Sequence, residues 1–327
     1  MNIVFFIGNG FDINLGLKTS YQDFYKYYKK QKSTSDAVSV FKNAIDPTHE
    51  TWSDLEQALG KFTSSLNNKQ EFFEVFEDVV QNLSTFIGNQ EFEIEQFSNI
   101  SNKVYSGLVR PEKSLSGRQN AKIGAILNQT DRKTSVITLN YTRMLERVLA
   151  GYTQKVKIEH VHGFANERMV LGVNDTSQIA NTVFQGDRQI TNALVKEDCN
   201  FSMDHGVEDV CKAMVSQADL FCIFGCSIGS TDMIWWNNIA DRLRQNNSSA
   251  LIIFIKTEAI HPLRLYETSD RVEEIKTQFM KKLSPTLGEE EVEVIKNKIF
   301  VAINSDIFNV KIKRRVQKIK PTPNVLG

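Results

Sequence analysis

The sequence predicts an α/β protein with a mainly parallel sheet flanked by helices. The chain opens with the unbroken apolar run 3–7, which lacks the polar alternation of a half-exposed strand. Such a run is typical of a strand buried on both faces. Comparable apolar runs recur as far as residue 303, and segments with helical spacing of apolar residues separate them. Strands that alternate with helices in this way favour a parallel sheet.

The first predicted strand stops at the loop Gly8-Asn9-Gly10. Glycines there allow backbone angles that other residues avoid, and they let the main chain approach a ligand closely. A loop of this kind between a buried strand and a helix commonly holds a phosphate or pyrophosphate. A tight turn is the alternative, because Ile13 stands where the dinucleotide fingerprint has its third glycine. After the loop, Thr19 or Ser20 is expected to cap a helix that extends to Lys30.

Residues 35–130 show no clear strand pattern and are predicted to form a helical insertion after the first βα unit. Apolar residues such as Phe72 and Phe76 recur there at helical spacing. The insertion should stand beside or over the sheet. It carries Asp54 and Glu56, for which a solvated position and a place near the site are both open.

Six more strands are predicted after the insertion. They are residues 135–139, 157–161, 169–171, 220–224, 250–255 and 298–303. Residues 176–205 are polar and weakly patterned, so we expect loops and helices that cover the site. We treat residues 1–327 as a single domain, in which 256–327 forms a helical and strand extension. The basic segment 311–320 is expected to be solvated.

The composition excludes several classes of protein. Lys plus Arg and Asp plus Glu are both 39, so a basic nucleic-acid binder is not indicated. No apolar stretch approaches the roughly 18 residues of a membrane helix, and the N-terminus lacks the basic leader of a signal peptide. The four cysteines form no Cys-x-x-Cys pair, which argues against a disulfide framework and a structural zinc site. We therefore expect a reduced, cytoplasmic enzyme.

Glycine and small polar or ionisable residues follow four or five of the predicted strands, directly where each strand ends. They are Gly8, Asn9, Gly10, Asp12, Asn140, His162, Gly163, Asn174, Asp175, Gly225, Ser227, Thr231 and Asp232. In parallel sheets, ligands bind beyond the carboxyl ends of the strands. One such strand end would be an ordinary turn, but several together predict a single polar pocket.

Two histidines near one strand end are the first candidates for chemistry. His162 stands before a glycine and could act as a general base near neutral pH. A histidine bonded to a backbone carbonyl is the alternative. His160 could support His162 or bind a metal, but two histidines without a third ligand give little reason to expect zinc.

Polar residues at the other strand ends suit nucleotide recognition. Asn140 offers a donor and an acceptor that could orient a water or a ribose hydroxyl, although an Asx-turn or a helix cap is equally open. Asp12 and Asp232 could bind ribose hydroxyls or cap their own helices. Tyr21 lies close enough to the first loop to touch a ligand.

Several of these motifs resemble those of one known family, the bacterial AbiH family of phage abortive-infection proteins. Its opening signature is similar to Gly8-Asn-Gly-Phe-Asp12, followed by Gly16-Leu-Lys-Thr19 and Tyr21-Gln-Asp-Phe24. Its later blocks resemble Trp52-Ser-Asp-Leu-Glu56, Thr138-Leu-Asn-Tyr-Thr142, His160-Val-His-Gly163 and Gly225-Cys-Ser-Ile-Gly-Ser-Thr-Asp232. The resemblance extends from residue 2 to about residue 240. It implies a role in phage defence.

That family is in turn similar to the sirtuin-like NAD-binding fold, a Rossmann-like fold. The resemblance implies that Asn140 and His162 form the catalytic pair at the nicotinamide end. The residues that it implies for NAD binding, together with their neighbours at the strand ends, are Gly8, Asn9, Gly10, Phe11, Asp12, Gly163, Asn174, Gly225, Ser227 and Asp232. Thr142 replaces an aspartate of that pattern, and the zinc-binding cysteine module is absent. These departures favour simple NAD hydrolysis over deacylation of a peptide.

The hypothesis from the sequence is therefore a cytoplasmic phage-defence effector that cleaves the nicotinamide–ribose bond of NAD. NAD would be the substrate, with no further cofactor and no metal. One alternative is a non-catalytic sensor of a nucleotide or phage component, which signals through a homo-oligomer. Another is an effector acting on a different nucleotide or on nucleic acid, with contacts from 35–130 and 311–320. A phage trigger that the sequence does not define is expected in each case.

Overall fold

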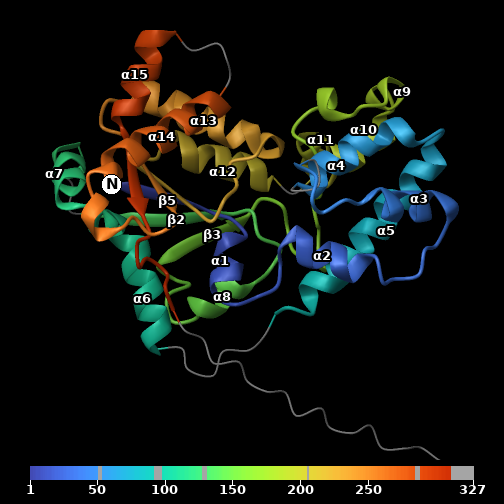
Figure 1. Ribbon diagram of the computed structural model, residues 1–327, viewed down its shortest axis with the longest axis horizontal. Helices are drawn as coiled ribbons and strands as arrows, with labels where there is room; N and C mark the ends of the chain where they lie inside the picture. The colour runs from blue at the N-terminus through green and yellow to red at the C-terminus, as the bar shows by residue number, and fades with distance from the viewer. Residues whose placement is uncertain (51–53, 92–97, 127–130, 205, 284–287, 311–327) are drawn as a thin grey trace, which may run out of the picture.

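The computed structural model describes residues 1–50, 54–91, 98–126, 131–204, 206–283 and 288–310. Within these residues, six strands form one sheet in the order β3-β2-β1-β4-β5-β6, and every pairing is parallel. The strands are β1 (Asn2–Ile7), β2 (Lys133–Thr138), β3 (Val156–His160), β4 (Leu220–Phe224), β5 (Ala250–Ile255) and β6 (Ile299–Ile303). Helices flank this sheet (Figure 1), so the predicted α/β fold is confirmed.

The short strand predicted at residues 169–171 is wrong. Arg168, with φ 54°, turns the chain just before this segment, and Val173 after it makes only an isolated bridge with Val195. Val170 N donates to the His162 carbonyl at 2.8 Å, so this segment bonds to the turn after β3 rather than to a strand of the sheet. The apolar side chains of this segment pack elsewhere. Leu171, for example, is buried in a hydrophobic core away from the sheet.

The central strand β1 supplies both faces of the sheet with buried side chains. It pairs with β2 on one side and with β4 on the other. Ile3, Phe5 and Ile7 enter the core on one face, whereas Val4 and Phe6 enter the core on the opposite face. This two-sided burial explains why the sequence shows a continuous apolar run rather than an alternating one.

Each face of the sheet is covered by its own group of helices (Figure 1). One face packs against α1 (Gly10–Asn14), α6 (Ser98–Val109), α7 (Gly117–Ile126) and α8 (Met144–Val148). The other face packs against α12 (Val207–Ser216), α13 (Met233–Gln245), α14 (Glu267–Lys282) and α15 (Glu289–Asn297). The protein body is therefore a three-layer sandwich of helices, sheet and helices.

A second group of helices forms a lobe beside the sheet, with a hydrophobic core of its own (Figure 1). We call it the helical lobe. It contains α2 (Tyr21–Tyr28), α3 (Asp36–Ala44), α4 (Leu55–Phe62), α5 (Lys69–Gly88), α9 (Thr182–Gln185), α10 (Arg188–Leu194) and α11 (Lys196–Ser202). As predicted, the described part of 35–130 contains no strand. The insertion is split, however, because α6 and α7 pack on the sheet rather than in the lobe.

Two helix caps fix the lobe where it meets the sheet. Ser20 caps α2 by accepting a hydrogen bond from Asp23 N at 3.1 Å, so Ser20 rather than Thr19 is the cap. Asp54 caps α4 by accepting from Glu56 N at 3.0 Å and from Gln57 N at 3.1 Å. A capped first turn places the side chain of Glu56 at a defined position next to the sheet.

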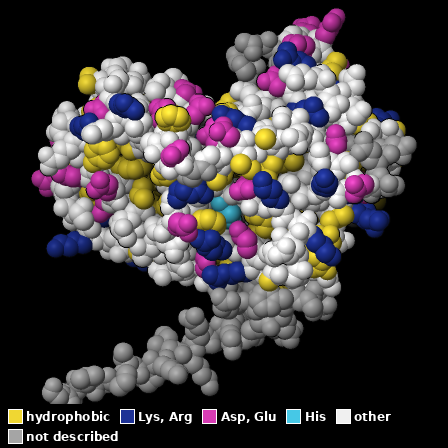
Figure 2. Space-filling view, turned by 180° about the vertical axis from the view of Figure 1, so that it is seen from behind, with side chains coloured by type: hydrophobic (Ala, Val, Ile, Leu, Met, Phe, Trp, Pro, Cys, Tyr) yellow, Lys and Arg dark blue, Asp and Glu magenta, His cyan; other side chains and the backbone are white. Residues whose placement is uncertain are grey.

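Two observations concern membrane-spanning helices and surface charge in the described part of the chain. None of the described helices is long and apolar enough to cross a membrane. Side chains of both charge signs are interspersed over the face drawn in Figure 2. This mixture agrees with the balanced charge of the sequence. The basic segment 311–320 lies outside the described residues.

Candidate functional site

A cavity of about 1100 Å³ lies beyond the carboxyl ends of β1 and β4, between the sheet and the helical lobe. The strand order reverses between β1 and β4, and open parallel sheets bind ligands at this kind of switch point. The structure brings many of the predicted site residues to this cavity. They are Gly8, Asn9, Gly10, Asp12, Asn140, His162, Gly225, Ser227 and Asp232.

The glycines of the two facing loops touch each other rather than a ligand. Gly8 N donates to the Phe224 carbonyl at 3.0 Å, and Gly10 N donates to the Gly225 carbonyl at 2.9 Å. A Cβ added to Gly10 would lie 2.5 Å from Gly225 Cα. The amides of Gly8 and Gly10 therefore already donate hydrogen bonds within the protein. The sequence predicted that they hold a phosphate, but in the structure they hold the loops after β1 and β4 together.

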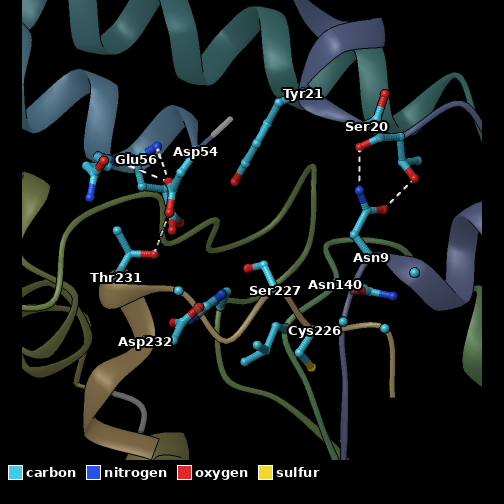
Figure 3. A pocket seen from close by; sticks show the side chains of 18 of the residues that line it. Asn9, Ser20, Tyr21, Asp54, Glu56, Asn140, Cys226, Ser227, Thr231 and Asp232 are labelled. Atoms are coloured by element: carbon cyan, nitrogen blue, oxygen red, sulfur yellow. Dashed lines mark hydrogen bonds and ion pairs between the residues drawn. The ribbon is translucent and has the colours of Figure 1, made fainter. Parts of the chain in front are cut away.

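Asn9 frames the cavity by joining the first loop to the start of the helical lobe. Its Nδ2 donates to the Thr19 carbonyl at 2.8 Å, and Thr19 Oγ1 donates to its Oδ1 at 2.5 Å. Figure 3 shows these bonds at one side of the cavity, with the Tyr21 side chain pointing inwards beside them. Asn9 thus holds Tyr21 and its helix over the strand ends.

Asp12 and Asn140 place unpaired acceptors at the sheet end of the cavity. Thr142 Oγ1 donates to Asp12 Oδ2 at 2.8 Å. Within the described residues, Asp12 Oδ1 and Asn140 Oδ1 are buried and accept no hydrogen bond. Burial raises the pKa of Asp12 to about 7, although the Thr142 hydrogen bond opposes this rise. Buried acceptors without a donor are costly in free energy.

His160 supports Asn140 from behind and does not line the cavity. Its Nδ1 lies 3.0 Å from the Asn140 carbonyl oxygen, and its Nε2 lies 2.5 Å from Glu146 Oε1. No group of three or more His, Cys, Asp or Glu side chains suited to a metal occurs in the described part of the chain. His160 thus supports the backbone at Asn140, and no hydrogen bond among the described residues joins it to His162.

His162 lines the cavity as a buried imidazole. Its Nε2 lies 3.1 Å from Asp232 Oδ1, and the Leu139 carbonyl also hydrogen-bonds to the ring. Burial lowers the pKa of His162, and the nearby Lys196 ammonium lowers it further. Since the ordinary pKa is already near 6.5, the neutral ring predominates at neutral pH.

Lys196 contacts the side chains of two residues of the cavity wall and was not predicted from the sequence. Its Nζ donates to Asp232 Oδ1 at 2.7 Å, to Glu56 Oε2 at 2.9 Å and to the Thr231 carbonyl at 3.0 Å. It thereby links the helical lobe to the loop after β4. Lys196 lies in a stretch without a clear pattern, and nothing in the sequence distinguishes it from a solvated lysine.

The buried carboxyl groups beside Lys196 differ in charge. Burial opposes ionisation of Asp232, but Lys196 and His162 outweigh it and hold the pKa of Asp232 well below its usual range. Burial raises the pKa of Glu56 to about 8 despite the single ion pair with Lys196. Burial alone would lower the pKa of Lys196, yet Asp232 and Glu56 keep it above its ordinary value. Asp232 and Lys196 are thus charged at neutral pH, and Glu56 is mostly protonated.

Three of the predicted NAD-binding residues lie outside this cavity. Phe11 is fully buried among the aromatic rings of the sheet core. Gly163, with φ +70°, forms a tight turn against Arg168. Asn174 Oδ1 accepts from Ile234 N at 3.0 Å and so fixes the first turn of α13. Packing thus explains Phe11, a tight turn explains Gly163, and a hydrogen bond to α13 explains Asn174.

Replacing Gly163 by Ala is expected to lower the stability of the fold by about 1–3 kcal/mol. The new Cβ would lie 1.8 Å from the Arg168 carbonyl oxygen, in a backbone conformation that favours glycine. Urea unfolding would measure the change, with Gly151→Ala as the control, since a Cβ there meets no described atom within 4 Å. Equal stability of both variants would contradict this interpretation of Gly163.

The parallel strand order and the cavity at its switch point define the class of protein, a doubly wound α/β protein with a ligand site at the strand ends. The chain belongs to the bacteriophage abortive infection AbiH family, whose model matches residues 4–254. It is thus an abortive-infection protein of phage defence, as the motifs predicted. A search of curated proteins found no match. Of the motif at 52–56, Trp52 and Ser53 lie outside the described residues.

Proposed function

We propose that this protein hydrolyses NAD at the nicotinamide–ribose bond as a cytoplasmic effector of phage defence. The observation that carries the proposal is the large cavity at the switch point, with Asn140 and His162 in its wall. NAD as the particular ligand follows from the similarity of the strand-end motifs to sirtuin-like proteins. No further cofactor is required for the reaction.

The cavity suits an extended dinucleotide in size and in chemistry. Its volume of about 1100 Å³ is at the upper end of ordinary ligand sites. Lys61 and Lys282 line it and can attract a pyrophosphate, a role that the bonded amides of Gly8 and Gly10 cannot fill. The inward-pointing ring of Tyr21 (Figure 3) can pack against a base.

The proposed catalytic groups would act on the positive charge that develops on the ribose. In hydrolysis, the C1′–N1 bond breaks and its electron pair enters the pyridinium ring, which leaves as neutral nicotinamide. Asn140, in the wall of the cavity, would orient the ribose or the attacking water through its side-chain amide. Neutral His162 would accept a proton from a ribose hydroxyl, and the Asp232 carboxylate would stabilise the oxocarbenium-like centre.

Purified protein incubated with NAD is expected to release nicotinamide, measured by chromatography. His162→Ala and Asn140→Ala should each lower the rate by about 100-fold or more, while circular dichroism shows an unchanged fold. Release that is unchanged in both variants would exclude these assignments. NAD that binds in a thermal-shift assay but stays intact would favour a non-catalytic sensor that signals through a homo-oligomer.

A further inference from the structure

We infer that Glu56 is a catalytic residue of this cavity and accepts the proton of the attacking water. The inference rests on the proposed function and adds a residue to it. Glu56 comes from α4 of the helical lobe, lines the cavity and is only 5% exposed (Figure 3). The lobe would therefore supply part of the chemistry as well as cover the strand ends.

The contacts of Glu56 fix one carboxyl oxygen and leave the other weakly bound. Oε2 accepts from Lys196 Nζ at 2.9 Å. Oε1 lies 3.5 Å from the hydroxyl of Tyr141, and that hydroxyl donates to the Val170 carbonyl at 2.9 Å. The hydrogen bond to Val170 is the shorter one, so Tyr141 satisfies Oε1 poorly. A water in the cavity can therefore donate to Oε1 without displacing a strong bond.

The carboxyl groups of Glu56 and Asp232 share one ammonium ion but differ in environment. Asp232 Oδ1 is in contact with both Lys196 and His162, and these two groups keep the carboxylate charged. Glu56 has one cationic partner, and burial raises the pKa of its carboxyl group to about 8. A pair of carboxyl groups whose pKa values are driven apart is a usual sign of divided roles in a site. Asp232 suits charge stabilisation, and Glu56 suits proton transfer near neutral pH.

His162 is less suited than Glu56 to take the proton of water. Its ring is already engaged by Asp232 Oδ1 at 3.1 Å and by the Leu139 carbonyl.

The bonds and the proton of the proposed reaction balance. Water oxygen bonds to C1′ as the C1′–N1 bond breaks, the pyridinium ring takes the electron pair, and the water proton passes to the Glu56 carboxylate and later to solvent.

The rate of nicotinamide release should therefore rise with pH, with its midpoint near pH 8 and a plateau above it, because Glu56 accepts a proton only when ionised. The groups that face Glu56 are Lys196, Asp232, Asp54, Tyr141 and Tyr21. The pKa of Lys196 stays above its ordinary value, since its carboxylate partners outweigh burial. Burial raises those of Tyr21 and Tyr141, and the pKa of Asp232 is held low. Lys196, Tyr21, Tyr141 and Asp232 therefore produce no rise in the rate near pH 8.

Glu56→Gln tests the inference, because Gln resembles the protonated acid but cannot accept the proton. We expect about a 100-fold loss of nicotinamide release at pH 8, with NAD affinity retained in calorimetry. Glu56→Asp should recover part of the rate, and Glu77→Gln, an exposed position of the same lobe, should match wild type. The Asp12→Asn variant should keep the midpoint of the rate against pH near pH 8. It distinguishes titration of Glu56 from that of Asp12, whose pKa burial raises to about 7.

The outcomes separate the inference from the proposed function. Wild-type protein that releases no nicotinamide at any pH would overturn NAD hydrolysis itself. Wild-type release together with full activity of Glu56→Gln would overturn the role of Glu56 alone. A pH profile that is flat from about pH 7 to pH 9 would also contradict Glu56 and assign the proton to His162, whose neutral form already predominates there.

Discussion

Lys196→Met is expected to destabilise the protein by about 3–5 kcal/mol, the usual effect of removing one partner of a buried ion pair. Lys196 is 7% exposed, and its ammonium neutralises Asp232 at 2.7 Å. Methionine fills a similar volume but leaves the Asp232 carboxylate without its main counter-charge. Urea unfolding of the purified variant measures the loss directly.

Two further variants identify the cause of this loss. Lys196→Met combined with Asp232→Asn should recover part of the stability, because the uncompensated charge is then removed as well. Lys212→Met is the matched control, since Lys212 pairs with Glu197 and Glu208 at a partly exposed position. It should cost less than about 1 kcal/mol. A Lys196→Met protein as stable as the Lys212→Met protein would contradict the central role of this ammonium.

Gly225→Ala is expected to cost about 3 kcal/mol and to weaken NAD binding. Gly225 has φ +69°, and an added Cβ would lie 2.7 Å from Gly10 Cα and 2.9 Å from Phe11 N. Neither backbone atom can move without separating the β1 and β4 loops, which form the floor of the cavity. Thermal unfolding and NAD titration would measure the two effects.

The control for Gly225→Ala is the same change at Gly88, at the end of α5. A Cβ on Gly88 would meet no described atom within 4 Å, so Gly88→Ala should leave both stability and NAD binding intact or raise stability slightly. If Gly225→Ala behaves like Gly88→Ala, the close contact between the two loops is not a structural requirement.

The strands were predictable because each leaves a local signal. β1, β4 and β5 are buried on both faces, and their continuous apolar runs identify them without knowledge of their partners. The position of the cavity then followed from the general rule for parallel strand ends. Asn140, His162 and Asp232 were found in this way, since each stands close after a strand.

The contribution of the lobe could not be predicted because it depends on long-range packing. Glu56 and Lys196 are 140 residues apart in sequence yet share a hydrogen bond of 2.9 Å. Glu56 belongs to a sequence motif, but only burial distinguishes Lys196 from a solvated side chain, and burial arises when the lobe packs against the strand ends. The converse holds for three residues that stand in sequence motifs but have structural roles. They are Phe11, Gly163 and Asn174.

The most direct test of the account is a crystal structure of the Glu56→Gln variant with NAD, since slow turnover should preserve the ligand. We predict NAD across the carboxyl ends of β1 and β4, with the nicotinamide–ribose bond beside Asn140 and the residue-56 side chain. The pyrophosphate should lie towards Lys61 and Lys282. NAD bound elsewhere on the protein, or an empty cavity at saturating NAD, would contradict the proposal that this cavity is an NAD site.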